Sequence, residues 1–169
     1  MYYTYYQSPL GDIALTANDQ GLTTLTFIAG KNGTSKEFKD SATSLIPEGY
    51  QENPEKFTQV CQQLTEYFTG ERKKFDLPLA ASGTPFQQKV WRALCEIKQG
   101  ETKTYAWLAK KISNEKAVRA VGSANGANPI ALIVPCHRVI GSNGKLTGYA
   151  GGLALKAKLL MHEGALFKP

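Results

Sequence analysis

Cysteine and histidine are scarce in this 169-residue chain, which has three cysteines (Cys61, Cys95, Cys136) and two histidines (His137, His162). The cysteines are odd in number and far apart, which argues against a disulfide framework and for a reducing compartment. There is no CxxC or HxxxH pair, so a four-ligand zinc site of the usual spacing cannot be assembled. We therefore predict that the protein binds no metal.

Long apolar runs are also missing, although 42% of the residues are hydrophobic. No run approaches the roughly 20 residues that cross a bilayer. The N-terminal MYYTYYQSPLG has neither the basic start nor the apolar centre of a signal peptide. These absences predict a soluble, cytoplasmic protein without a membrane partner, long enough for one substantial core or for two small domains.

Positive charge is concentrated in one half of the chain. Residues 1–80 contain 7 Lys and Arg against 10 Asp and Glu, a net charge of −3, whereas residues 81–169 contain 13 against 4, a net charge of +9. Two explanations fit this charge equally well. One is a basic surface that is simply solvated, and the other is a polyanionic partner, most often nucleic acid, bound through its phosphates. The change near residue 80 also marks an expected domain boundary.

The first half is expected to form a sheet and one helix. Apolar residues alternate through residues 2–28, with turn signals at SPLGD and NDQG, which predicts an antiparallel meander. The polar stretch 29–44 has no clear period and is expected to be a surface connection. Residues 53–70 predict a helix that Asn53 caps and Gly70 ends. The alternating KKFDLPLA is expected to return to the sheet as a strand.

The second half is expected to consist of short helices. The segment TPFQQKVWRALCEIKQG predicts a helix capped by Thr84. Two shorter helices follow: TYAWLAKKI, which Thr104 can cap, and EKAVRAVGSAN, with Val118 and Val121 inward and Arg119 outward. Two short helices, a tight turn and basic residues on the second outline a helix-turn-helix. This weak pattern gains weight because it coincides with the basic half.

The segment VPCHRVIG places Cys136, His137 and Arg138 directly after residues 131–134, an apolar run typical of a buried strand. Most cysteines in such surroundings are structural. A thiol with an ordinary pKa of about 8.5 is only a few per cent ionised at neutral pH, so a nucleophilic role needs a base such as the adjacent imidazole. Glu163 closes an apolar helix, and we expect it to orient His137 in a relay of the triad type.

These residues belong to an ordered set of motifs that resembles the O6-alkylguanine-DNA alkyltransferases, also called methylated-DNA-protein-cysteine methyltransferases. The motifs are TPFQQKVW, GETKTYAWLA, VRAVGSANGANP, PCHRVIG and GYAGGL, and the resemblance runs without a gap from about residue 84 to 164. It implies an α+β protein of two domains. Residues 1–80 would form a ribonuclease-H-like α/β domain, and residues 81–169 a winged-helix-like, helix-turn-helix domain that binds DNA.

The resemblance also implies the reaction and the partner. An alkyl group on guanine O6, and less readily on thymine O4, would move onto the protein's own cysteine in a single turnover that needs no cofactor. The substrate would be double-stranded DNA, bound through its minor groove with the damaged base flipped out of the helix. The protein is expected to act as a monomer.

The catalytic residues follow from the same resemblance. Cys136 would accept the alkyl group, and His137 would be its base, acting through a bound water. Glu163 would hold His137, and Asn128 would brace the turn that carries the cysteine. Tyr105 would donate a hydrogen bond as guanine leaves, because displacement of the alkyl group puts charge on the base.

Further residues are assigned to DNA and to the pocket. Arg119 would enter the duplex and fill the gap left by the flipped base. The other residues expected to contact DNA are Thr104, Ala120, Ser123 and Asn125. The walls of the pocket are expected to be Val139, Tyr149, Ala150 and Gly151.

Two other functions fit part of this pattern. A cysteine hydrolase also needs Cys, His and an acid, but it has no use for a basic helix pair. A sensor that binds alkylated DNA without transfer would share most of these motifs, but such relatives replace the acceptor cysteine, usually by tryptophan. Cys136 is present in this chain, which favours transfer.

Overall fold

The computed structural model describes residues 1–28 and 44–168, and the chain divides into two compact units, Met1–Ser82 and Gly83–Pro169. The surface connection predicted over residues 29–44 lies, up to residue 43, outside the described ranges. No helix within these ranges combines the length and the apolar character needed to cross a membrane.

A four-stranded sheet forms the centre of the first unit. Its strands, in the spatial order β3-β2-β1-β4, are β1 (Tyr2–Ser8), β2 (Gly11–Ala17), β3 (Leu22–Phe27) and β4 (Gln51–Glu52). The first three are antiparallel, which confirms the predicted meander, and β4 runs parallel to β1. Thr4, Leu15 and Leu25 are buried neighbours in this register, so one face of the sheet supplies the core.

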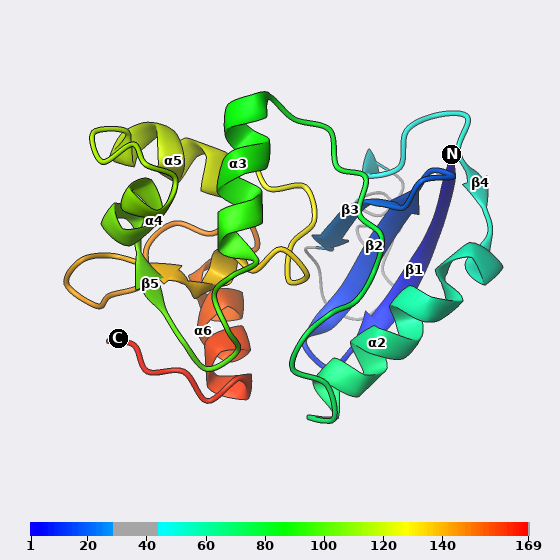
Figure 1. The fold of residues 1–169 in the computed structure, drawn as a ribbon. Coiled ribbons are helices and arrows are strands. Elements are labelled where there is room, and N and C mark those ends of the chain that lie inside the picture. Colours follow the sequence, from blue (N-terminus) through cyan, green and yellow to red (C-terminus); the bar gives the residue numbers. More distant parts are fainter. Residues whose placement is uncertain (29–43, 169) are drawn as a thin grey trace. The chain divides into compact units, whose positions relative to one another are not determined.

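One helix packs against this sheet. It begins with a 3₁₀ turn, η1 (Pro54–Phe57), and continues as α2 (Thr58–Phe68), which lies along one face of the sheet (Figure 1). Leu64 and Tyr67 on its inner side are fully buried. The predicted helix is confirmed, but its first turn is tighter than expected, and the Asn53 side chain makes no capping bond.

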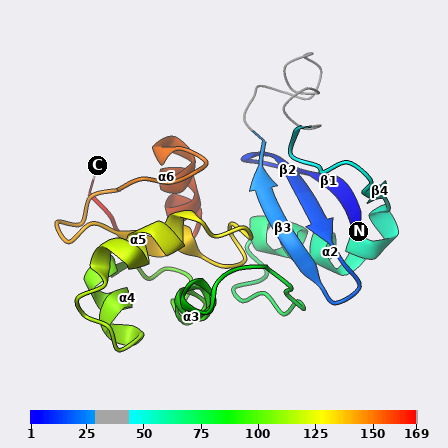
Figure 2. The ribbon, with the colours of Figure 1, turned by 90° about the horizontal axis from the view of Figure 1, so that it is seen from above.

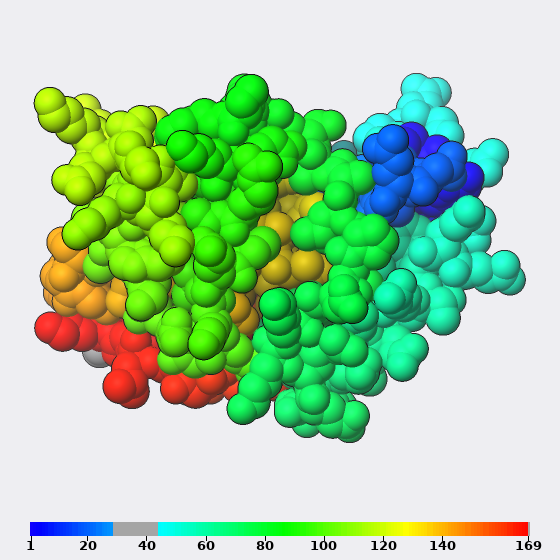
Figure 3. Space-filling model, in the orientation of Figure 1, coloured from blue at the N-terminus to red at the C-terminus, as the bar shows by residue number. Residues whose placement is uncertain are grey.

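The second unit is built mainly from helices. They are α3 (Pro85–Leu94), α4 (Tyr105–Lys111), α5 (Val118–Gly126) and α6 (Leu153–His162). Two short strands, β5 (Lys103–Thr104) and β6 (Val139–Ile140), pair in parallel. On the face drawn in Figure 3, the green and yellow-green residues of α3, α4 and α5 cover most of this unit.

The two helix caps predicted in the second unit are present. Thr84 forms a capping box with Gln87 at the start of α3, and Thr104 accepts the Trp107 N–H at 3.1 Å at the start of α4. Trp91 then fixes α3 to α5, because its Nε1 donates to the Ala124 carbonyl at 2.8 Å. The sequence therefore specifies where these helices begin.

The α4–α5 pair has the predicted helix-turn-helix arrangement. The two helices contact each other, and Leu108 and Val121 are fully buried. Arg119 is exposed, as expected. Val118 was expected to face inward but is 39% exposed, because it occupies the first position of α5, before the turn that reaches the core.

The buried strand predicted over residues 131–134 is wrong, because these residues form a buried turn. Leu132 has a φ of 71°, and the Val134 N–H donates to the Ile130 carbonyl at 3.1 Å. The Asn128 side-chain amide donates to the Val134 and Ile130 carbonyls at 2.8 and 3.3 Å. In a strand, the backbone of a neighbouring strand would donate to such carbonyls. The apolar run correctly indicated burial, but not an extended backbone.

The strand predicted within KKFDLPLA is reduced to one bridge. Leu22 donates its N–H to the Pro78 carbonyl at 3.0 Å and accepts the Ala80 N–H at 2.7 Å. Pro78 has no N–H to donate to the Gln20 carbonyl, so the pairing cannot extend from Leu22 back toward the turn that precedes β3. The two backbones approach closely at Gly21, where a Cβ atom would lie 2.5 Å from the Pro78 carbonyl oxygen.

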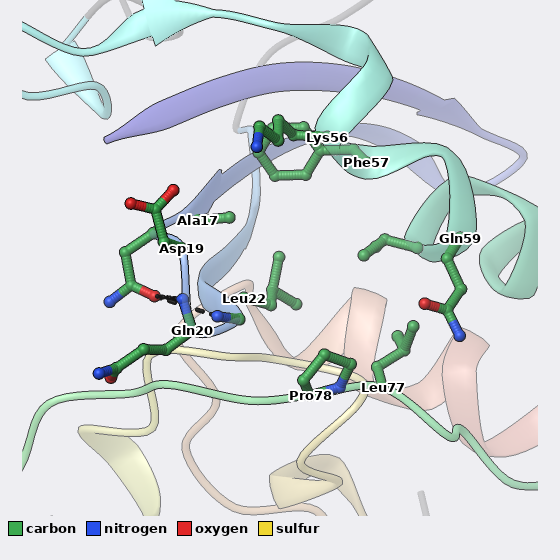
Figure 4. Close-up of a pocket in the computed structure, with 12 residues that line it drawn as sticks. Ala17, Asp19, Gln20, Leu22, Lys56, Phe57, Gln59, Leu77 and Pro78 are labelled. Carbon is green, nitrogen blue, oxygen red and sulfur yellow. Dashed lines mark hydrogen bonds between the residues drawn. The ribbon is translucent and has the colours of Figure 1, made fainter.

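A hollow of about 200 Å³ lies beside this crossing (Figure 4). Its walls come from the turn between β2 and β3, from the start of α2 and from Leu77 and Pro78. Asn18 fixes the turn, because its Oδ1 accepts the N–H groups of Gln20 and Gly21 at 2.8 and 3.0 Å. The turn that carries Gly21 is therefore fixed where it meets Pro78.

We expect Gly21→Ala to destabilise the first unit by about 1–3 kcal/mol, because the added methyl group would overlap the backbone of Pro78. The matched control is Gly11→Ala, since Gly11 follows a turn in the same unit, also has a positive φ, and has no neighbouring atom within 4 Å of its Cβ position. Denaturant unfolding measures both variants. A loss for Gly21→Ala no larger than that for Gly11→Ala would contradict the contact.

Candidate active site

The Cys136 turn lies in the interior of the second unit. It forms a 3₁₀ turn, η2 (Cys136–Arg138), that contacts α3 and α6. Figure 2 shows the yellow-to-orange stretch that carries it passing between α5 and α6. Cys136 is 6% exposed and His137 is fully buried, so both reactive side chains are shielded from bulk water.

His137 and Glu163 are joined by a hydrogen bond. Nε2 of His137 lies 2.9 Å from Oε2 of Glu163, the residue that ends α6. An ionised carboxylate can only accept, so Nε2 carries the proton and Nδ1 is left as an acceptor. Nδ1 has no hydrogen-bond partner among the described residues. The imidazole is therefore oriented with its basic nitrogen available.

Arg138 binds the same carboxylate through two bonds. Its Nε donates to Oε1 at 2.9 Å and its Nη2 to Oε2 at 3.0 Å, while its Nη1 donates to the Ile97 carbonyl at 2.7 Å. Burial by itself would raise the pKa of Glu163, but the hydrogen bonds and charges of His137 and Arg138 hold that pKa at about 2. Glu163 is therefore ionised throughout the neutral range.

Burial decides the protonation of the reactive pair. It raises the pKa of Cys136, although the Asn128 side chain and the Lys156 ammonium act in the opposite direction. It lowers the pKa of His137, although Glu163 opposes it. The resting pair at neutral pH is thus a thiol and a neutral imidazole. Ionisation of the thiol requires that the imidazole take its proton.

Lys156 is a fully buried cation beside this pair. Its Nζ donates to the Val139 carbonyl at 2.6 Å and to the Thr147 carbonyl at 3.0 Å. Burial lowers the pKa of Lys156 to about 8, and the nearby Cys136 acts against that shift. A cation in this position favours the thiolate form of Cys136.

Lys156 and Arg138 have no role predicted from the sequence. In both cases the sequence signal is a charged residue within an apolar segment, where a buried charge needs a hydrogen-bonding or ionic partner. Lys156 stands three residues before Leu159 and seven before Glu163, so the three share one face of α6. Arg138 stands inside a buried run that continues to Ile140.

Of three other predicted residues, Asn128 and Tyr149 lie near Cys136. Asn128 holds the turn that precedes Cys136, through the amide bonds described above. The Tyr105 hydroxyl, at the start of α4, lies 2.8 Å from Oγ1 of Thr147. The Tyr149 hydroxyl is buried without a hydrogen-bond partner among the described residues. Burial raises the pKa of Tyr149, and the charges of Cys136 and Glu163 raise it further.

The other predicted pocket residues differ in exposure. Val139 is fully buried and follows the Cys136 turn directly, whereas Ala150 and Gly151 are exposed before α6. Among the residues that the structure describes, no group of three or more His, Cys, Asp or Glu side chains lies close enough to hold a metal ion.

The residues predicted to contact DNA fall into two groups. Those exposed on α5 are Arg119, Ala120 and Ser123. Thr104 is partly buried as the cap of α4. Asn125 is 4% exposed, and its Nδ2 donates to the Cys136 carbonyl at 3.5 Å. Asn125 lies on the inner face of α5, where its side-chain amide supports the Cys136 turn, and its contact with DNA stays a prediction.

Comparisons with known proteins match both units. Residues 85–165 match the model of the 6-O-methylguanine DNA methyltransferase, DNA binding domain, and residues 1–81 match that of the 6-O-methylguanine DNA methyltransferase, ribonuclease-like domain. The chain is 51% identical over 165 residues to a methylated-DNA--protein-cysteine methyltransferase of Methanosarcina acetivorans, covering 98% of this chain and 99% of that protein. The constitutive methyltransferase of Bacillus subtilis is 44% identical, with coverages of 99% and 98%.

A solved structure supports the same assignment. The Mycobacterium tuberculosis OGT in complex with DNA superimposes with a TM-score of 0.83 at 42% identity, covering 97% of this chain and 93% of that one. These matches confirm the predicted family and the predicted two-domain fold. The chain belongs to the 6-O-methylguanine DNA methyltransferase family.

Proposed function

We propose that this protein repairs DNA by moving the alkyl group of O6-alkylguanine, and less readily of O4-alkylthymine, onto Cys136. The observation that carries this proposal is the buried relay of Cys136, His137 and Glu163 in a chain whose two units both match the family. Methylated-DNA--protein-cysteine methyltransferase is the activity for which its relatives are named. No cofactor is needed, because the thiol itself is the acceptor.

Proton transfer begins the reaction. Nδ1 of His137 accepts the Cys136 proton, directly or through a water, and the resulting imidazolium is stabilised by the Glu163 carboxylate. Lys156 stabilises the thiolate. The thiolate then attacks the alkyl carbon, an S–C bond forms, the C–O6 bond breaks, and its electron pair remains on guanine. Burial keeps the thiol protonated until the alkylated nucleobase occupies the pocket and the imidazole accepts the proton.

The leaving guanine needs a hydrogen-bond donor. The Tyr105 hydroxyl supplies it, and Tyr149 forms a wall of the pocket together with Val139, Ala150 and Gly151. Because Cys136 is buried, it cannot reach a base that remains stacked in a duplex, so the alkylated base must be flipped into the protein. Arg119, exposed on α5, then fills the gap in the duplex.

The partner is double-stranded DNA containing the alkylated base, bound through its minor groove by the α4–α5 pair. A homologous structure has been solved in complex with DNA, and the net charge of +9 over residues 81–169 fits a polyanion. Arg119, Ala120 and Ser123 are the contact residues that α5 exposes. The protein acts as a monomer in the cytoplasm, a reducing compartment that suits its free cysteines.

Cys136→Ala is expected to abolish alkyl transfer and to leave binding of alkylated DNA nearly unchanged, because only the acceptor atom is lost. Incubation with duplex carrying a radiolabelled O6-methyl group measures transfer, and fluorescence anisotropy measures binding. Cys95→Ala, which removes an exposed thiol, is the matched control and should transfer normally. Label on the Cys136→Ala protein would disprove the assignment.

Repair is expected to stop at one alkyl group per active chain. The product on Cys136 is a thioether, which lacks the carbonyl that lets water regenerate a cysteine hydrolase. Limiting protein and excess methylated duplex would be incubated, with repaired guanine counted over time and the intact mass followed. The mass should rise by about one methylene unit, located on the Cys136 peptide. Repair well beyond one equivalent would refute a single turnover.

Arg119→Ala is expected to slow repair of duplex on the order of ten- to a hundredfold, because base flipping costs a few kcal/mol and the gap would stay unfilled. Reaction with the free base O6-benzylguanine should change little. Lys116→Ala, which removes an exposed positive charge just before α5, is the control and should weaken DNA binding only modestly. Equal losses on both substrates would assign Arg119 to the pocket or to folding.

A further inference from the structure

Glu163 has a second partner that the transfer reaction does not use. Both carboxylate oxygens are bound by Arg138, and one of them also faces His137. Arg138 is itself anchored, because its Nη1 donates to the buried Ile97 carbonyl at 2.7 Å in the segment after α3. The guanidinium therefore connects η2, the end of α6 and the end of α3 through one rigid group.

The position of Glu163 in its helix makes this partner necessary. Glu163 is the C-cap of α6, and the C-terminus of a helix carries partial negative charge, which disfavours a carboxylate. The side chain of Glu163 is also completely inaccessible to solvent, and a buried carboxylate without a cation takes up a proton or draws one toward it. His137 is the nearest group that can hold such a proton.

The charges around His137 oppose one another. Glu163 favours the imidazolium, whereas Arg138 and the Lys156 ammonium on α6 disfavour it, and the neutral Cys136 thiol adds no charge. Without Arg138, the full carboxylate charge would act on His137, and the pKa of His137 would rise. An imidazolium cannot accept the Cys136 proton. As the pH falls, the reaction would therefore be lost at a higher pH than in the native protein.

We propose that Arg138 is a positioning residue that keeps Glu163 oriented and half-neutralised, so that His137 stays neutral and able to accept the Cys136 proton in mildly acidic solution. This inference rests on the proposed transfer to Cys136. Arg138 touches neither the alkyl group nor the base. It acts only through Glu163, so its loss should alter the pH dependence of transfer as well as its rate.

The test compares Arg138→Gln and Arg138→Lys with the native protein. Single-turnover transfer from saturating methylated duplex to Cys136 is measured between about pH 5 and pH 9. In Arg138→Gln, the acid limb of the profile should move to higher pH, and at pH 6 the rate should fall on the order of tenfold relative to its own maximum. Arg138→Lys keeps the charge and should keep the acid limb. It should react roughly tenfold more slowly at every pH, because an ammonium cannot make the paired bonds by which the guanidinium holds both carboxylate oxygens.

Arg92→Gln is the matched control, since it removes the same charge from an exposed position on α3. Its profile should coincide with that of the native protein. Circular dichroism and the fraction of chains that become alkylated show whether each variant is folded. The native protein is measured first: absence of label on its Cys136 would reject the proposed function itself, independently of any effect of Arg138.

An unchanged acid limb in folded Arg138→Gln would overturn the proposal, since a structural contact alone lowers the rate without moving the profile. If Arg138→Gln does not fold, Arg138→Met, which removes the same charge, decides by the same criterion. Native rates in Arg138→Lys would show that the paired bonds of the guanidinium do not position Glu163.

Discussion

The Glu163 carboxylate is the group on which the arrangement of the second unit depends. It is buried together with two cationic side chains and one imidazole: Lys156, Arg138 and His137. A buried charge is tolerated only when it is paired and hydrogen-bonded. Glu163 binds Arg138 and His137 directly, and Lys156 binds backbone carbonyls. The end of α6 must therefore contact the η2 turn, because Glu163 lies at the first and Arg138 and His137 lie in the second.

This pairing makes an inert thiol compatible with a reactive site. A cysteine with a lowered pKa would react with any electrophile that reached it, but burial raises the pKa of Cys136. On the proposed mechanism, neighbouring groups supply the reactivity, namely an oriented imidazole and a buried ammonium. Cys95 is exposed and lies in no such relay among the described residues. On the same mechanism Cys136 is alkylated only once, so a resting thiol that does not react with dissolved electrophiles is an advantage.

Local sequence signals predicted the frame of the fold, and the pair of His137 with Glu163 was also expected and is present, whereas the pair of Arg138 with Glu163 was not predicted. Thr84 and Thr104 cap their helices as expected, because capping involves residues only three positions apart. Residues 131–134 were predicted as a strand, since apolar content reports burial but not the backbone bonds that Asn128 supplies. The bond between Arg138 and Glu163 spans 25 residues, and no periodicity reports it. A charged residue on an apolar helix face, such as Lys156, is the remaining sequence signal for such pairs.

The turn that precedes Cys136 explains why transfer should also change the protein. Leu132 is held at a φ of 71°, a conformation that costs a non-glycine residue about 1–2 kcal/mol, and the Asn128 amide keeps the turn in that form. On the proposed mechanism, an alkyl group is added to the sulfur within this closely packed interior, which tolerates extra volume poorly. Asn128 interacts with Cys136 as well as holding this turn, so volume added at the sulfur acts on the turn directly. The alkylated chain is thus expected to be less stable than the native one, because overpacking and the loss of the Asn128 hydrogen bonds both cost free energy.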